Sequence, residues 1–233
     1  SSNYVYNNIV GELKVPSSGS TTGLVGIYIS GGSNIGLYYN TVYLDATSTG
    51  TNFGSSALSA SSTPTLELIN NIFVNNSIAN GTGLTVAYRR SSTTLTSYSL
   101  TSDNNNFYAG TPSASNLIFY DGTNALQTLE QYKSFVTPRD LHSVTELPPF
   151  INITTSPYDL HLKTTVPTQM ESGGQVVTTP PITTDIDGDL RNTTNPDIGA
   201  DEGNFIFLDI SGPSISYDPL LNTPSTANRN LVA

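Results

Sequence analysis

The sequence has no cysteine and no tryptophan, and only 11% of its 233 residues are charged. Without cysteine, a disulfide framework, a thiolate metal site and a cysteine nucleophile are all excluded. Lys and Arg number 8 against 18 Asp and Glu, a net charge of −10, so we expect neither nucleic acid nor an anionic membrane as a partner. No apolar run approaches the roughly 18 residues of a membrane span, so we expect no membrane insertion.

What the sequence has instead is a repeat of about thirty residues. A tetrad of Asn, a polar residue and two apolar residues begins at positions 7, 40, 70 and 105, at spacings of 33, 30 and 35 residues. Short apolar segments follow at 26–29, 57–58, 84–88 and 117–120. Short strands between Gly, Ser and Thr turns, with almost no helix-forming runs, predict an all-β solenoid in which each strand pairs with its counterpart one coil away.

Stacked coils place equivalent residues in columns. The tetrad asparagines are expected to form a column at a bend, where Asn tolerates a left-handed backbone and its amide can bond the amide of the next coil. The predicted inward apolar column is Ile9, Val42, Ile72 and Phe107.

A different pattern occupies residues 126–147. Leu129, Tyr132, Phe135 and Val136 recur at near-helical spacing, which predicts one short helix. We interpret it as an insertion before the last coil that closes the exposed core.

The chain resembles the right-handed parallel β-helix repeat family, which includes pectate-lyase-like enzymes and many bacterial surface proteins. The coil pattern covers roughly residues 3–147. Further motifs resemble the closing segment of bacterial secreted β-helix proteins: Tyr-Asp-Leu-His-Leu at 158–162, Glu-Ser-Gly-Gly at 171–174, Asp-Ile-Asp-Gly-Asp-Leu-Arg at 185–191 and Asp-Ile-Gly-Ala-Asp-Glu at 197–202. The resemblance implies export and attachment within a large multidomain protein.

The predicted domain organisation is a β-helix over residues 1–203, with its closing segment at 148–203. Residue 1 begins almost directly in a strand-like repeat, and solenoids normally carry caps, so we expect that earlier coils are missing. Residues 204–233 are expected to be a linker, the first strands of an immunoglobulin-like module, or a tail along the side of the solenoid.

Few residues are candidates for catalysis. Glu12, Asp45 and Asn75 each lie five positions after a tetrad's first Asn, and neighbouring coils would place them about 5 Å apart. Such a column suits a calcium site or a paired-carboxylate mechanism, although the same position also suits an ordinary turn.

A second catalytic candidate is the pair Arg89 and Arg90, near Asp103 and Asp121. Lyase chemistry needs a cation to neutralise a uronate carboxylate and a base to remove the α-proton. The alternative interpretation is a pair of solvated loop arginines. His142 and His161 lie in no metal-spaced or triad-like pattern, and a strand-edge role is expected for His161.

Two binding features remain. Asp185, Asp187 and Asp189 resemble a calcium loop but lack the EF-hand spacing, so the alternative is a turn that caps the helix end, with Arg191 paired to Asp185, Asp197 or Asp201. Tyrosines on or beside the repeat strands could form an exposed row that stacks on sugar rings, or could simply fill the strands. The candidates for this row are Tyr38, Tyr43, Tyr88 and Tyr108.

The low content of ionisable residues and the closing-segment motifs favour a non-catalytic role. We expect a β-helix segment of a large secreted or cell-surface bacterial protein, acting as a rigid spacer, an adhesive or a carbohydrate-binding surface. Its expected partners are a polysaccharide, a surface glycan or other modules of the same polypeptide. The alternative is a polysaccharide lyase or glycoside hydrolase that acts in a groove along the β-helix.

Overall fold

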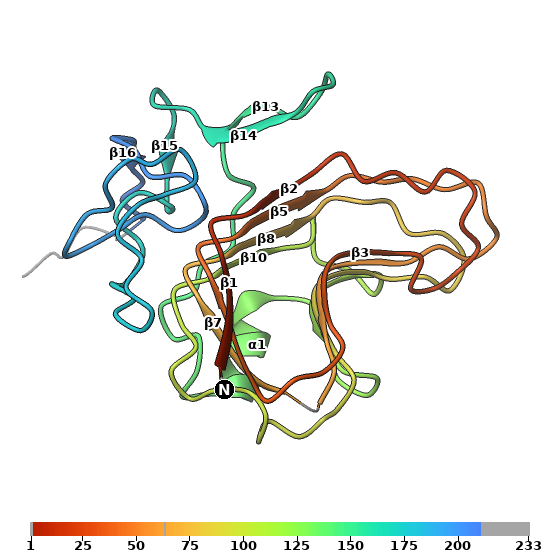
Figure 1. The fold of residues 1–233 in the computed structure, drawn as a ribbon. Coiled ribbons are helices and arrows are strands. Elements are labelled where there is room, and N and C mark those ends of the chain that lie inside the picture. The colour runs from red at the N-terminus through yellow and green to blue at the C-terminus, as the bar shows by residue number, and fades with distance from the viewer. Residues whose placement is uncertain (1, 63, 211–233) are drawn as a thin grey trace, which may run out of the picture.

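The computed structural model describes residues 2–62 and 64–210. Its main body is a right-handed parallel β-helix of about four coils, so the predicted fold is confirmed. Three parallel sheets run along the axis (Figure 1). The first contains β1 (Ser2–Tyr6), β4 (Asn34–Tyr38) and β7 (Thr65–Ile69). The second contains β2 (Ile9–Val10), β5 (Thr41–Leu44), β8 (Ile72–Asn75) and β10 (Asn106–Tyr108). The third contains β3 (Leu24–Ile29), β6 (Ser55–Ala60), β9 (Thr85–Arg90), β11 (Asn116–Tyr120) and an antiparallel edge strand, β12 (Ala125–Leu126).

The predicted asparagine ladder is present at the bend between the first and second sheets. The side-chain Nδ2 of Asn8 donates to Asn40 (2.8 Å), Asn40 donates to Asn71 (2.9 Å), and Asn71 donates to Asn105 (2.9 Å). Each acceptor oxygen also receives the backbone N–H of the preceding ladder Asn. Because three of these side chains are fully buried, the ladder satisfies polar groups that would otherwise be unpaired at the turn.

The ladder shows that the tetrad alignment was one residue out of register in two coils. The residue before each ladder Asn adopts a left-handed backbone: Asn7, Tyr39, Asn70 and Asn104 have φ of 52–58°. In coils 1 and 3 the tetrad's first Asn takes this left-handed position and the second joins the ladder. Asn suits both positions, since it tolerates positive φ and its amide can bond an equivalent amide, so spacing alone did not separate them.

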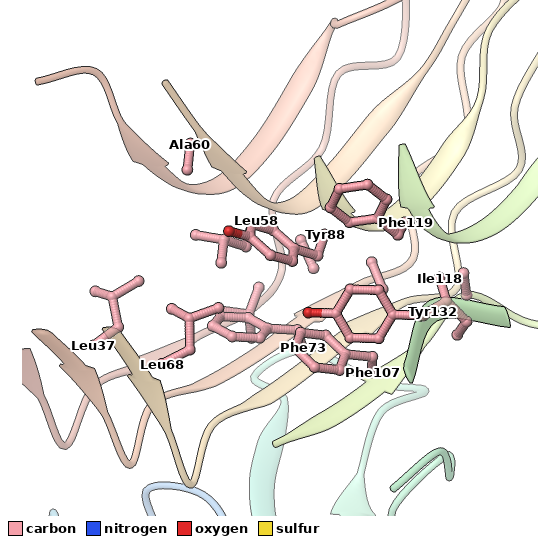
Figure 2. Close-up of a cluster of buried hydrophobic side chains, with 14 of the residues drawn as sticks. Leu37, Leu58, Ala60, Leu68, Phe73, Tyr88, Phe107, Ile118, Phe119 and Tyr132 are labelled. Carbon is pink, nitrogen blue, oxygen red and sulfur yellow. The ribbon is translucent and has the colours of Figure 1, made fainter. Parts of the chain in front are cut away.

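The strand register corrects the predicted inward column in the same way. The aligned residues that face the core are Val10, Val42, Phe73 and Phe107. Their neighbours Ile9 and Ile72 face outward and are packed or covered by the later part of the chain. Figure 2 shows the aromatic end of the core, where the rings of Phe73 and Phe107 stack at a centroid distance of 5.8 Å.

Helix α1 (Leu129–Val136) confirms the predicted short helix and covers the core beside the last coil. A capping box formed by Thr128 and Gln131 begins it. The ring of Tyr132 lies 5.2 Å from that of Phe107 and 5.4 Å from that of Phe119 (Figure 2). The core is therefore closed at this end by an aromatic side chain from the helix.

The ladder ends at Asp140, which follows helix α1 in the chain and is fully buried. Its carboxylate accepts hydrogen bonds from Asn105 Nδ2 (3.0 Å), Tyr98 Oη (2.5 Å), Tyr132 Oη (2.6 Å) and Ser143 Oγ (2.7 Å). Burial raises the pKa of Asp140, although these four donors oppose the shift. An acid thus replaces the next asparagine where the repeat stops.

The closing segment, predicted as residues 148–203, continues to residue 210 in the structure. It packs along the side of the coils and not across their end, which corrects the predicted helix-end cap. It contains β13 (Phe150–Asn152), β14 (Asp159–Leu162), β15 (Pro167–Thr168) and β16 (Ile206–Phe207). Figure 1 shows β13 and β14 beside the outer face of the second sheet. Leu160 and Leu162 of β14 are buried there with Tyr43 and Ile72.

The left-handed residues at the bend hold this closing segment. Asn7 Nδ2 donates to the carbonyl of Thr184 (2.7 Å), Asn70 Nδ2 to that of Gln175 (2.6 Å) and Asn104 Nδ2 to that of Gly173 (2.9 Å). In coil 2 the equivalent residue is Tyr39, whose hydroxyl donates to Gln175 (3.0 Å). Residues 173–184 therefore cross all four coils, from the fourth to the first.

The described part of the tail belongs with the closing segment. Phe205 is buried with the Tyr43 cluster, and β16 pairs in parallel with β15. The part of the predicted immunoglobulin-like module at 212–217 lies outside the described residues. No helix in the described ranges is long and apolar enough to cross a membrane.

Candidate functional site

The predicted column of Glu12, Asp45 and Asn75 does not form. Leu44, not Asp45, is the register partner of Asn75. Asn75 is buried and bonds Ser55 and the carbonyl of Val86, while Asp45 accepts Tyr158 Oη (2.5 Å) and Lys14 Nζ. The one-residue error in the tetrad alignment explains this, because it moves every side chain to the opposite face of the strand.

Arg89 and Arg90 point to opposite sides of β9. Arg90 is buried and donates to Tyr88 Oη (2.9 Å) and Ser97 Oγ (2.9 Å). Arg89 donates to Ser56 Oγ (2.9 Å), and its guanidinium lies over the ring of Tyr120. Neither arginine forms a hydrogen bond or ion pair with Asp103 or Asp121, so the structure does not assemble the lyase-type set.

Three of the four tyrosines predicted as a surface row are buried. Tyr88 faces the core, and Tyr38 and Tyr43, each 2% exposed, face outward beneath the closing segment. Tyr108 is half-buried. Alternation along the strands was a sound basis for placing two of them outward, but it carried no information about what covers that face.

The three predicted metal-binding carboxylates are not brought together as a ligand set among the described residues. Asp185 is buried, and its oxygens accept the backbone N–H groups of Asp187 (2.9 Å), Asp189 (2.9 Å) and Glu202 (3.0 Å). Its role is to shape the turn. Arg191 pairs with Glu202 at 3.1 Å. It does not pair with its predicted partners Asp185, Asp197 or Asp201.

A groove lies where the first sheet meets the closing segment. Two adjoining hollows of about 420 and 290 Å³ share Tyr38, Glu67 and Thr179 in their walls. The outer face of β1, β4 and β7 forms the floor, and residues 175–179 form one wall. Volumes of this size are typical of ligand-binding clefts.

Hydroxyl groups hold a carboxylate at the centre of this groove. Both Tyr38 Oη and Thr101 Oγ1 donate to Glu67, one to each oxygen. Burial, with the hydrogen bond to Glu67, raises the pKa of Tyr38 well above its usual value, so its hydroxyl stays a donor at any physiological pH. The ring of Tyr4, which is 38% exposed, stacks on Tyr38 at 5.9 Å. The groove thus combines an accessible aromatic ring with a fixed acceptor.

A second carboxylate, Asp103, lines the same hollow. Its side chain accepts the backbone N–H of His142 (2.7 Å) and contacts His142 Nδ1 at 2.6 Å. The imidazole itself is largely exposed. The sequence did not place Glu67 in a groove, because the wall that defines it comes from about a hundred residues further along the chain.

A separate cluster surrounds His161 on β14. Asp159 contacts its Nδ1 at 2.6 Å, and Asp187 Oδ2 lies 2.9 Å from its Nε2. Burial alone would lower the pKa of His161, but the hydrogen bond to Asp159 and the charges of Asp201, Asp159 and Asp187 raise it overall. The strand-edge position predicted for His161 is confirmed, whereas its gathering with acids from two distant turns was not foreseen.

The fold and the groove place this chain among parallel β-helix proteins with a lateral cleft. Comparisons with protein-family models, with curated proteins and with solved structures gave no match. Function must therefore be argued from the chain's own geometry.

Proposed function

We propose that this chain is a non-catalytic, carbohydrate-binding β-helix segment of a secreted or cell-surface bacterial protein of the pectate-lyase-like type. The observation that carries the proposal is the groove over β1, β4 and β7, in which the exposed ring of Tyr4 and the fixed carboxylate of Glu67 line the same hollow on either side of Tyr38. An apolar ring face suits a sugar ring, and carboxylate and hydroxyl oxygens suit its hydroxyl groups.

The arrangement of the carboxylates favours binding over catalysis. Both oxygens of Glu67 already accept hydroxyl groups, and Asp103 is held by His142 and its own loop. No described residue that lines the two hollows is Lys or Arg, so a uronate carboxylate would lack the cation that lyase chemistry needs. A rigid solenoid with pre-formed donors and acceptors suits recognition at low entropic cost.

The alternative function is glycoside hydrolysis, because Glu67 and Asp103 line one hollow and two carboxylates are the usual catalytic pair of such enzymes.

The binding proposal is tested in two steps. Polysaccharides that bind would first be identified on a glycan array, and affinity would then be measured by calorimetry. We expect Tyr4→Ala to weaken binding about tenfold, which corresponds to about 1.4 kcal/mol of lost contact.

The matched control is Tyr28→Ala. Tyr28 is 63% exposed on β3, on a different sheet, and it lines neither hollow. Equal loss of affinity in Tyr4→Ala and Tyr28→Ala would show that the polysaccharide does not bind in the groove. Release of reducing ends that is abolished in Glu67→Gln would replace the binding proposal with the hydrolase.

A further inference from the structure

The cluster around His161 has the composition of a metal site and is distinct from the groove. Atoms of His161, Asp187 and Asp201 that can act as ligands all lie within 4.8 Å of one another. In a tetrahedral site with bonds of about 2.0–2.2 Å, ligand atoms stand about 3.3–3.6 Å apart, so small side-chain movements would complete the geometry. The three residues come from β14, the turn at 185–189 and the stretch that follows Ala200.

His161 is oriented as a ligand. Asp159, two residues earlier on the same strand, fixes Nδ1 at 2.6 Å, which directs Nε2 toward Asp187 and Asp201. Metal-binding histidines usually have such a carboxylate on the nitrogen that does not bind the metal. Although Nε2 lies 2.9 Å from Asp187 Oδ2, the two atoms are not aligned as a hydrogen bond, and Nε2 is shielded from solvent. A buried ring nitrogen therefore faces two carboxylates without a satisfactory bond to either.

The supports of the three residues are rigid. Leu160 and Leu162, on either side of His161, are each 3% exposed. Asp201 is tied to β14 because its Oδ2 accepts the backbone N–H of Leu162 (2.7 Å), which leaves Oδ1 available. The turn that carries Asp187 is shaped by the buried Asp185. A site held in this way needs little reorganisation on binding.

The charge balance also favours a cation. Asp159, Asp187 and Asp201 place three carboxyl groups around one imidazole, which supplies at most one positive charge. The nearby Arg191 is already paired with Glu202.

We propose that His161 Nε2, Asp187 and Asp201 bind one divalent transition-metal ion, of which Zn²⁺ is the representative, with Asp159 as the positioning residue. One imidazole with carboxylates selects a borderline ion such as Zn²⁺ over Ca²⁺, which prefers oxygen ligands alone. The ion ties together three stretches of the closing segment that share no regular hydrogen-bonded sheet.

The test is calorimetric titration of the chelator-treated chain with ZnCl₂. We expect one Zn²⁺ per chain and at least a tenfold weaker affinity in Asp187→Asn. Asp187 is 55% exposed at its side chain, so this variant should keep the fold. The matched control is Asp189→Asn in the same turn, which removes the same charge from an exposed position outside the cluster and should change the affinity less than twofold.

A second readout identifies the ligands. Bound Co²⁺ should give the visible absorption of a nitrogen- and oxygen-ligated ion, and His161→Gln should abolish it. Absence of Zn²⁺ binding would show that the cluster is only an imidazole held between carboxylates and would overturn the proposal. Equal weakening by Asp187→Asn and Asp189→Asn, or Ca²⁺ binding as tight as Zn²⁺ binding, would overturn it as well.

Discussion

The coils and the closing segment of this protein are stabilised by different means. The coils repeat, and their cohesion comes from stacked apolar side chains, parallel strands and the asparagine ladder. The closing segment has only short strands, and side chains bonded to backbone groups hold it, among them the buried Asp185, Asp197, Glu202 and Arg191. Ionisable side chains are therefore more frequent in the closing segment than in the coils. The groove lies where the two regions meet.

The ladder offers the strongest way to break the coils alone. Asn71 is fully buried, donates to Leu37, Ile69 and Asn105, and accepts from Asn40. Replacing it with Ala leaves several buried polar groups unpaired, at about 1–3 kcal/mol each. We expect Asn71→Ala to lower the free energy of unfolding by about 4 kcal/mol, measured by urea denaturation followed by circular dichroism.

Asn34→Ala is the control for the ladder variant. Asn34 is exposed on β4, and its side chain is outside the ladder, so its loss should change stability by less than about 0.5 kcal/mol. Similar destabilisation by both variants would mean that the ladder contributes no more than a surface asparagine.

Arg191 offers a way to release the closing segment while the coils stay folded. Its guanidinium is buried, bonds Glu202 (3.1 Å) and Asn7 (3.0 Å), and lies 3.8 Å from the centre of the Tyr39 ring. Arg191→Met leaves the Glu202 carboxylate buried without its cation, which costs about 3 kcal/mol.

Hydrogen exchange should show the effect of Arg191→Met. We expect faster exchange over residues 173–202 and unchanged protection in β5, β6 and β8. Loss of protection throughout the coils would show that the two regions unfold as one unit. Lys163→Met, which removes an exposed cation from the same segment, should leave both patterns unchanged.

Per pH unit, titration of Asp197 is expected to change stability less than either substitution does. Burial raises the pKa of Asp197 to about 7, against the N–H groups of Gly203 and Ser172, which lower it. The unfolded value is about 3.9, so the folded closing segment holds this proton more tightly. Its contribution to stability is complete below pH 4 and is lost as the pH rises through 7, at no more than about 1.4 kcal/mol per pH unit.

Carbon-detected NMR titration of the Asp197 carboxyl group measures this directly, and protection factors of the closing segment at pH 5 and pH 8, each taken relative to the intrinsic exchange rate at that pH, measure its consequence. A midpoint near 4, or greater protection at the higher pH, would contradict the expected sign.

The sequence was sufficient for the coils because repetition reveals them. Asn at spacings of 30–35 residues, with an apolar pair in each tetrad, predicted the solenoid, the bend and the ladder, and near-helical spacing predicted α1. The sequence was insufficient to set the strand register to within one residue, since Asn suits both the left-handed and the ladder position. It also could not show that Tyr38 and Tyr43 are covered, or that His161 meets Asp187 and Asp201, because non-repeating segments bring those contacts together.

The bonds between the left-handed residues at the bend and residues 173–184 restrict where a coil can be inserted into the solenoid. Gly173 is bonded to coil 4 through Asn104, Gln175 to coils 3 and 2 through Asn70 and Tyr39, and Thr184 to coil 1 through Asn7. With coils about 4.8 Å apart, this crossing spans roughly 14 Å. A coil inserted between Asn70 and Asn104 would break one of the contacts of Gly173 and Gln175, because two residues span at most about 7 Å and the contacts would then lie about 9.6 Å apart. We therefore expect duplication of a repeat to be tolerated better outside this part of the crossing than within it.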